Sequence, residues 1–315
     1  MSKFAQFAIP KELILESQII RELCHKRPHK VFILSLFNLS TYVFLSLVGF
    51  WINAWWLWAV ILCFQGIIIA GFLGAVHEGT HGNLSSCART NRLAGVFWST
   101  LIFVNFTLYK YYHLKHHKYT NIPGDTEQPE QIGVFSNIRD YVLSFVPTGG
   151  FYIFFWRASI QSCFGRFPDF IRSEKARRAV QVDNMVLLLW LLLSATVTYW
   201  WTEYALLFYW CPLLISHPML FGIGLPEHYG CAQSSDPKCN TRSTSSNFLL
   251  RWTNWYANYH AEHHLYPSVP SYNLPRLHLL IGKHFTFQER SFILFHLKLF
   301  WSLLQNSNKN PRAAR

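Results

Sequence analysis

The amino-acid sequence predicts an all-α integral membrane fold, with four transmembrane helices in two hairpins and a cytoplasmic helical cap domain that holds a di-metal centre. Three observations lead to this prediction. Charged residues make up only 14% of the 315 residues, against about 25% in ordinary soluble domains. Long uncharged stretches interrupt the chain, and the histidines fall largely into three tight groups. The first two observations predict the membrane helices, and the third predicts the metal centre.

The first hairpin is predicted from the stretch between Lys30 and Glu78, which contains no Asp, Glu, Lys or Arg. This stretch is about twice as long as the roughly 20 helical residues that cross a bilayer, so it should form two spans. Its tryptophans around the expected turn favour the membrane interface. Two further uncharged stretches, separated by an aromatic turn that contains Glu203, repeat the pattern. We therefore expect four spans, near residues 31–50, 54–76, 184–202 and 204–224.

Basic residues sort to one side of these predicted spans. With both hairpins inserted from the same face, all 28 Lys and Arg residues lie on the side that holds both termini and the segment between the hairpins. The positive-inside rule assigns that side to the cytoplasm, which leaves only Glu203 charged on the opposite side. Membrane orientation therefore explains the net charge of +12, and we expect no nucleic-acid partner.

Outside the spans the sequence indicates shorter elements. Two uncharged stretches, 93–109 and 141–156, fall below the roughly 18 residues that a span needs, so we expect interfacial or half-buried helices. The seven cysteines follow no metal-binding spacing, which predicts reduced thiols. The N-terminus lacks the apolar core of a cleaved signal peptide. The expected organisation is a cytoplasmic amphipathic segment over 1–30, the main domain over 31–285, and a C-terminal helix with a disordered tail over 286–315.

The histidines are spaced as metal ligands on helices. His77 and His81 are four residues apart, and two HxxHH sequences follow at 113–117 and 260–264. Residues three or four apart lie on one helix face, so each group can direct its imidazoles to a shared point. A further histidine, His228, follows the fourth predicted span to the same face. The predicted ligands are His77, His81, His113, His116, His117, His228, His260, His263 and His264.

Nine histidines exceed the needs of a single metal ion, because a structural zinc site is closed by four ligands. Two metals are indicated, although imidazole suits iron, zinc, copper and nickel alike. Two other interpretations use fewer of these residues. Residues 77–81 also fit the HExxH pattern of zinc metalloproteases, with Glu78 as general base, but that site would leave both HxxHH groups without a role. A metal transporter could use histidine clusters, but apart from His217 and Glu203 the predicted spans offer mainly Ser, Thr, Asn and Gln, which poorly supports a transport path.

At these residues the chain resembles the membrane fatty acid desaturase and hydroxylase superfamily, whose signature is HxxxH, HxxHH and HxxHH. The resemblance covers roughly residues 30–285. HLKHHKYTN at 113–121, followed by Asp125, is similar to the second box of that superfamily, and NYHAEHHLYP at 258–267 is similar to the third. Together with LPEHYGC and TRSTSSN, these sequences look most like bacterial or cyanobacterial acyl desaturase-type proteins.

The resemblance implies a non-haem di-iron centre that is held by the nine histidines and uses O2 as co-substrate. The expected reaction is desaturation of a fatty acyl chain, and hydroxylation or ketolation of a lipid or carotenoid is the alternative. The chain contains no His-Pro-Gly-Gly sequence of a fused cytochrome b5, so the reaction requires an external electron donor of ferredoxin or cytochrome b5 type. The expected location is a bacterial inner or thylakoid membrane, with both termini and the active site on the cytoplasmic side.

Polar residues beside the boxes are candidate partners of the ligands. Asn258 would hold a metal-bound water or orient a ligand, and Glu78, Asp125 and Glu262 are candidate acceptors for imidazole N–H groups. The alternative interpretation of each acid is a solvated surface carboxylate. His217 lies inside the fourth predicted span, where polar groups are costly. It either borders a substrate channel or forms a hydrogen bond within the helix bundle, and we favour the second. We assign no catalytic residue beyond the metal centre.

Overall fold

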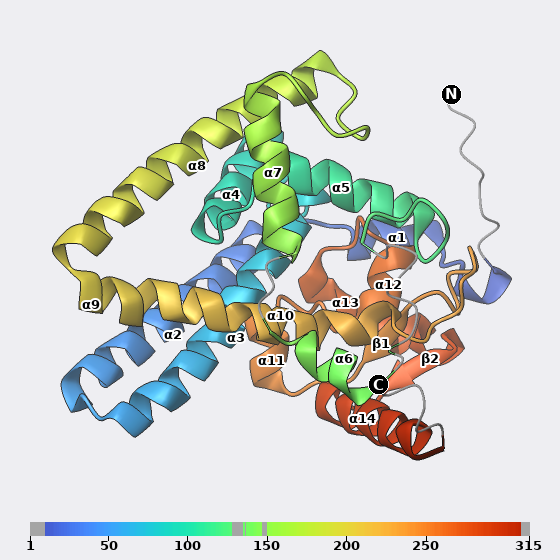
Figure 1. Ribbon diagram of the computed structural model, residues 1–315. Coiled ribbons are helices and arrows are strands. Elements are labelled where there is room, and N and C mark those ends of the chain that lie inside the picture. The colour runs from blue at the N-terminus through green and yellow to red at the C-terminus, as the bar shows by residue number, and fades with distance from the viewer. Residues whose placement is uncertain (1–9, 128–134, 136, 147–149, 310–315) are drawn as a thin grey trace.

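A computed structural model describes residues 10–127, 135, 137–146 and 150–309 of the chain, which are mostly helical (Figure 1). The elements in chain order are η1 (Lys11–Leu13), α1 (Ser17–Leu23), α2 (Pro28–Ile52), α3 (Trp55–Thr80), α4 (Ala88–Leu101), α5 (Phe106–Tyr119), α6 (Ile138–Leu143), α7 (Gly150–Cys163), α8 (Glu174–Trp200), α9 (Thr202–Ala205), η2 (Leu206–Trp210), α10 (Cys211–His228), β1 (Arg242–Thr244), α11 (Phe248–Thr253), α12 (His260–Leu265), η3 (Ser271–Asn273), α13 (Leu274–Ile281), η4 (Gly282–His284), β2 (Phe287–Glu289) and α14 (Phe292–Lys309).

Four helices of the described chain are long and apolar enough to cross a membrane. They are α2, α3, α8 and the run from α9 through the π-helical turn η2 to α10. The number rises to five if α4 and α5, which meet at an angle of 100°, are taken as one broken span. The prediction of an all-α membrane fold with four spans is therefore confirmed. α8 begins at Glu174, ten residues before the predicted boundary at 184.

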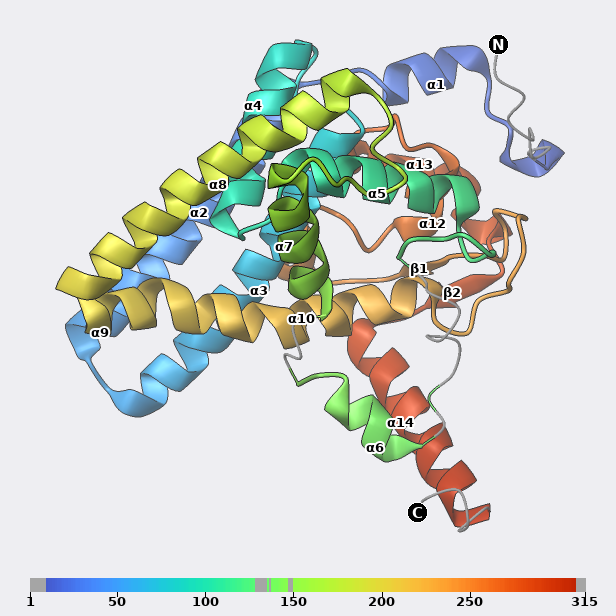
Figure 2. The same cartoon turned by 45° about the horizontal axis from the view of Figure 1, so that its top comes forward.

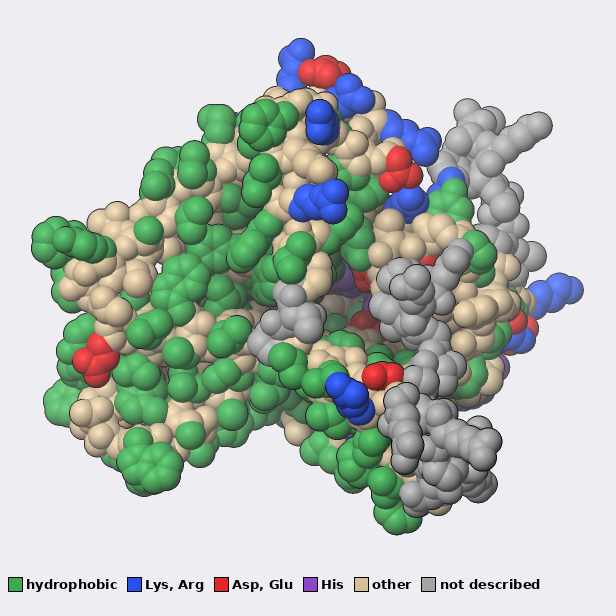
Figure 3. All heavy atoms as spheres, viewed as in Figure 1, with side chains coloured by type: hydrophobic (Ala, Val, Ile, Leu, Met, Phe, Trp, Pro, Cys, Tyr) green, Lys and Arg blue, Asp and Glu red, His purple; other side chains and the backbone are tan. Residues whose placement is uncertain are grey.

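The two hairpins, α2–α3 and α8–α10, extend toward the same end of the molecule (Figures 1 and 2). The first turns at Asn53, which adopts a left-handed conformation with φ 45°. Tryptophans stand on both sides of this turn, and Trp51 and Trp55 are 81% and 84% exposed. Figure 3 shows hydrophobic side chains over the hairpins, whereas Lys and Arg gather where α8 begins. This sorting of side chains is that of a protein with its hairpins in lipid.

The bend between α4 and α5 directs α5 toward the histidines. Phe103 takes a positive φ of 54° at the bend, and the Asn105 side chain caps α5 while it donates to the backbone of α8. Asp183 of α8 accepts hydrogen bonds from the backbone N–H and the hydroxyl of Thr107, and it pairs with Arg92 of α4. These buried polar contacts fix the start of α5 on α8. They also explain why α8 begins at Glu174, before its apolar part.

Several short elements differ from expectation. The stretch 93–109 forms the end of α4 and the start of α5, with the bend between them. The stretch 141–156 is not one helix, because α6 ends at Leu143 and α7 begins at Gly150, and residues 147–149 lie outside the described residues. α14 continues to Lys309, so the predicted disordered tail is helical up to that residue, and 310–315 lie outside the described residues. β1 and β2 pair in parallel, in an otherwise helical fold.

Two apolar cores position the histidine-bearing helices. The larger core joins α3, α4, α5, α7 and α8 through side chains such as Val76, Trp98 and Leu108. The smaller core holds α12 and α13 against the N-terminal segment, through Leu13, Leu23 and Leu277 among others. The side chains at the centres of both cores are at most a few per cent exposed. Helices from distant parts of the sequence are thus held rigidly around one site.

Gly71 lies where α3 meets the backbone after α11. A Cβ atom on Gly71 would stand 1.8 Å from the Thr253 carbonyl oxygen, and a backbone atom cannot move aside as a flexible side chain can. We expect Gly71→Ala to lower the free energy of unfolding by about 1–3 kcal/mol, as overpacking does. Thermal unfolding of the detergent-purified protein measures this loss. Gly150→Ala is the matched control, because a Cβ there meets nothing within 4 Å. Equal stability of the two variants would contradict the prediction.

Candidate metal centre

Four segments of the chain bring the nine histidines of the predicted ligand set together. His77 lies in the last turn of α3, and His81 follows its end. α5 carries the first HxxHH sequence, α12 carries the second, and His228 is the last residue of α10. The ligand nitrogens form two neighbouring groups, in each of which they all lie within 4.8 Å of one another. We call these the five-histidine group (His77, His81, His113, His117 and His263) and the four-histidine group (His116, His228, His260 and His264).

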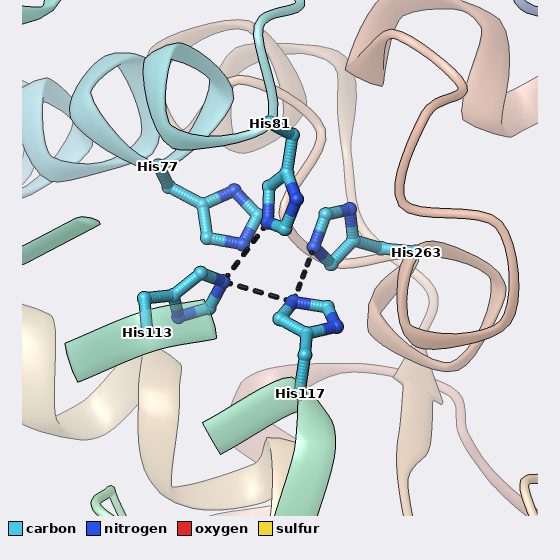
Figure 4. A group of neighbouring side chains, drawn as sticks. All are labelled: His77, His81, His113, His117 and His263. Carbon is cyan, nitrogen blue, oxygen red and sulfur yellow. Dashed lines mark hydrogen bonds between the residues drawn. The ribbon is translucent and has the colours of Figure 1, made fainter. Parts of the chain in front are cut away.

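The five-histidine group is shown in Figure 4, where its rings converge from α3, α5 and α12. His113 Nε2 lies 3.1 Å from His81 Nε2 and 2.9 Å from His117 Nε2. His263 Nε2 lies 3.0 Å from His117 Nε2. The four-histidine group has the same design, because His260 Nε2 lies 2.9 Å from the Nε2 atoms of both His228 and His264. In each group the Nε2 atoms face a shared point.

Helix periodicity explains how each HxxHH sequence serves both groups. On α5, His113 and His117 are four residues apart and share a face, so they enter the five-histidine group, whereas His116 points to the other group. On α12 the assignment is reversed. His260 and His264 share a face and enter the four-histidine group, whereas His263 points to the five-histidine group. The two boxes therefore interlock across the centre.

The outer nitrogens of several rings contact acceptor oxygens of the protein. His113 Nδ1 lies 2.7 Å from Glu127 Oε1, and His116 Nδ1 lies 2.7 Å from Asp125 Oδ1. His228 Nδ1 faces the backbone carbonyl oxygen of Asn240 at 3.3 Å. A carboxylate or carbonyl oxygen accepts a hydrogen bond from Nδ1–H, and a neutral ring with its proton on Nδ1 has its lone pair on Nε2. Several lone pairs that face one point about 3 Å apart repel one another unless a cation lies between them, so the donor set fits a metal ion in each group.

Burial keeps most of these rings neutral. It lowers the pKa of the histidines outside the membrane spans well below the ordinary value, and neighbouring histidines lower it further; they are His81, His113, His117, His260, His263 and His264. For His116, burial acts in the same direction, but the nearby carboxylates of Glu127 and Asp125 outweigh it and raise the pKa. Neutral imidazole is the form that binds a metal, so burial prepares the site for binding.

The structure gives the four candidate partner residues different surroundings. Asp125 contacts the ligand His116, as described above, and its second oxygen accepts the backbone N–H of Asn121. Glu78 accepts the backbone N–H of Ser271, and its other oxygen lies 3.8 Å from His77 Nδ1. Glu262 accepts hydrogen bonds from Ser243 and His278, neither of which belongs to the two groups. The Asn258 amide donates to the Thr244 carbonyl oxygen, and its Oδ1 is buried without a hydrogen-bond partner among the described residues.

Two glutamates beside the histidines were missed by the sequence reasoning. Glu127 contacts His113, and Glu227 Oε1 lies 3.4 Å from His260 Nδ1. Both positions carried a signal, since Glu127 is two residues beyond Asp125 and Glu227 directly precedes His228. Sequence reasoning could have extended the search for acceptors to both. An acid that lies next to a predicted ligand or shortly after a box is therefore a candidate acceptor.

A cavity of about 300 Å³ opens beside both histidine groups. Its walls come mainly from α3, α5 and α10, and it reaches His77 and His113 of one group and His228 and His260 of the other. Apolar side chains, including Leu73, form most of the rest. His217 also lines this cavity, so the structure supports the first of the two roles considered for it, at the border of a channel. A largely apolar cavity beside two histidine groups that could each hold a metal ion has walls suited to a hydrocarbon chain.

Comparison with known proteins agrees with this geometry. The family model described as "Fatty acid desaturase" matches residues 53–295. Sphingolipid delta(4)-desaturase DES1 of Drosophila melanogaster is 28% identical over 229 residues, which cover 70% of this chain and 66% of that protein, just under two thirds of its length. Sphingolipid delta(4)-desaturase/C4-monooxygenase DES2 of Bos taurus is 23% identical, and the match covers 96% of this chain and 89% of that protein.

These relatives are animal proteins, so they do not bear on the resemblance to bacterial or cyanobacterial proteins. The family match spans both histidine groups and all but the first of the four membrane helices. It also disfavours the zinc protease interpretation, and the structure agrees because Glu78, the general base of that interpretation, is held by the Ser271 backbone. The match covers well over half of the chain, and the chain belongs to the fatty acid desaturase family.

Proposed function

We propose that this protein is a di-iron membrane enzyme that uses O2 to introduce a double bond into a lipid acyl chain. The observation that carries the proposal is the pair of histidine groups that border a largely apolar cavity. Family membership supports the oxidation of a lipid, by desaturation or hydroxylation. Iron is chosen because the family resemblance implies it, and the all-imidazole donor set is compatible with it.

Different residues of the chain would bind the metals, orient the ligands and bind the substrate. The five-histidine group would hold one iron and the four-histidine group the other, while Glu127 and Asp125 fix the rings of His113 and His116. The walls of the cavity would bind the acyl chain and exclude water. Bound iron would supply the oxidising chemistry, in which O2, two electrons and two protons convert –CH2–CH2– into –CH=CH– and two water molecules.

Several further properties belong to the same proposal. The electrons would come from an external donor of ferredoxin or cytochrome b5 type. The histidine groups and both termini would face the cytoplasm, because the basic residues lie on that side of the proposed spans. Hydroxylation is the second candidate reaction, because the name of the bovine relative joins a desaturase to a C4-monooxygenase. The relatives' names also make sphingolipids the first lipids to test.

Metal analysis and lipid profiling test the proposal together. We expect about two irons per chain in the purified protein, because each histidine group would hold one ion. A host that expresses the chain should accumulate a lipid that is two hydrogen atoms lighter, or one oxygen atom heavier if the enzyme hydroxylates. A single bound zinc ion and an unchanged lipid profile would contradict the proposal. The profile also decides between desaturation and hydroxylation.

A further inference from the structure

The cavity beside the histidine groups is not uniformly apolar. Two carboxylates line it, those of Glu127 and Glu227. A plain hydrocarbon chain needs only apolar walls, and a carboxylate that faces it loses hydration without compensation. The presence of acidic side chains next to the reacting end of a lipid cavity therefore requires an explanation.

Contacts within the protein explain the Glu127 carboxylate, because its Oε1 lies 2.7 Å from His113 Nδ1. Glu227 differs. Its side chain is 20% exposed and lines the cavity, and no described residue donates a hydrogen bond to either of its oxygens. His260 Nδ1 lies 3.4 Å from Oε1 but without hydrogen-bond geometry. Glu227 thus has acceptor capacity that the protein does not use.

The place of Glu227 relative to the four-histidine group limits what can use this capacity. His260 Nε2 faces His228 and His264, at 2.9 Å from each, whereas the opposite edge of the same ring faces Glu227. The carboxylate and the centre of the group are therefore separated by about the width of one imidazole ring. A group bound to Glu227 would lie only a few bonds along the lipid from a carbon that faces the histidines.

We propose that Glu227 accepts a hydrogen bond from the substrate, and that the substrate is a lipid with a hydroxyl or amide N–H within a few bonds of the oxidised carbon. The inference rests on the proposed lipid oxidation and narrows its substrate class. Mid-chain oxidation of a plain acyl group would instead place methylenes against the carboxylate, where they satisfy no acceptor. Glu227 thereby sets both the choice of lipid and the position of attack.

The test compares three probes on the full-length protein in membranes supplied with an electron donor. The first probe is an N-acyl-sphinganine, the second is its analogue without the C3 hydroxyl, and the third carries an N-methylated amide. We expect the wild type to oxidise the first probe with a kcat/KM at least about tenfold above that of one analogue, because a ligand that lacks the donor leaves the acceptor in the cavity unpaired. The analogue that is rejected identifies the donor as hydroxyl or amide.

Variants of Glu227 show whether this residue causes the preference. Glu227→Leu should abolish it, mainly by raising KM for the favoured probe, whereas Glu227→Gln retains an acceptor oxygen and should keep part of it. Glu203→Leu is the matched control, since it removes an exposed carboxylate at the far end of the second hairpin. An equal loss with all three probes, together with loss of metal, would mean that Glu227 only orients His260, and would overturn the inference.

A binding measurement separates this inference from the proposed reaction. Each probe is added to the detergent-purified protein, and its thermal stabilisation is recorded without oxidation. Stabilisation by the N-acyl-sphinganine above the analogues, lost in Glu227→Leu, supports the recognition role even if no lipid is oxidised, in which case only the proposed reaction fails. Equal stabilisation by the three probes, or none, overturns the recognition role, whatever the lipid profile shows.

Discussion

His263→Ala and His116→Ala should each abolish product formation while the protein still inserts into the membrane. His263 belongs to the five-histidine group and His116 to the four-histidine group, so each variant would remove one ligand from a different one of the two proposed metal sites. We expect activity to fall by more than about a hundredfold, which is the upper end of the effect of losing a partner that only supports a ligand. The metal content should fall from about two ions per chain toward about one in either variant.

Product analysis and metal analysis of the purified variants measure both effects. His29→Ala is the control, because His29 is exposed in the first turn of α2 and lies outside both groups. It should retain activity and both ions. Full activity in either ligand variant, or two bound ions in both, would contradict the assignment of ligands.

Asp125→Asn should weaken metal binding in the four-histidine group and leave the five-histidine group largely intact. The Asp125 carboxylate is fully buried and holds His116 through Nδ1. An amide removes the negative charge and, in one of its two orientations, offers an N–H that forces the ring proton onto Nε2. We expect a loss of about 10–100-fold in metal affinity and activity, which titration of the metal-depleted protein with iron measures.

Glu262→Gln provides the comparison for this prediction. Its carboxylate is also buried, but its partners are Ser243 and His278, which belong to neither histidine group. We expect this variant to reduce stability more than metal affinity. The prediction would be contradicted if Asp125→Asn bound metal normally and Glu262→Gln bound it more weakly. Glu262, and not Asp125, would then support a metal ligand.

The sequence predicts the spans and the clustering of histidines well, because both depend on local patterns. Uncharged length identifies a span, and the spacing of His113 and His117 identifies one helix face. The division of nine histidines between two groups depends on how α5 and α12 face each other, which no local pattern records. The start of α8 before residue 184 also depends on tertiary contacts. Asp183 is charged and buried in this helix because it contacts Arg92 and Thr107, and a local pattern does not record these contacts.

Other features give too weak a signal to be predicted. β1 and β2 are three residues long, too short for a period of two to stand out. A polar group inside a span usually finds a partner on a neighbouring helix, which favours a bundle role for His217, but here α10 presents it to a cavity. Glu127 and Glu227 look like ordinary acids in the sequence. Only their distances to His113 and His260 show that they belong to the site.

The interlocking of the two HxxHH sequences also links metal binding to folding. Each ion would bridge α5 and α12, which are far apart in the chain, and would act as a reversible cross-link that closes a long loop. Because each helix serves both groups, the first ion to bind would order the ligands of the second. Removal of both ions should therefore weaken the contact between α5 and α12 more than removal of one, since each group keeps its own ligands and can hold its ion when the other is absent.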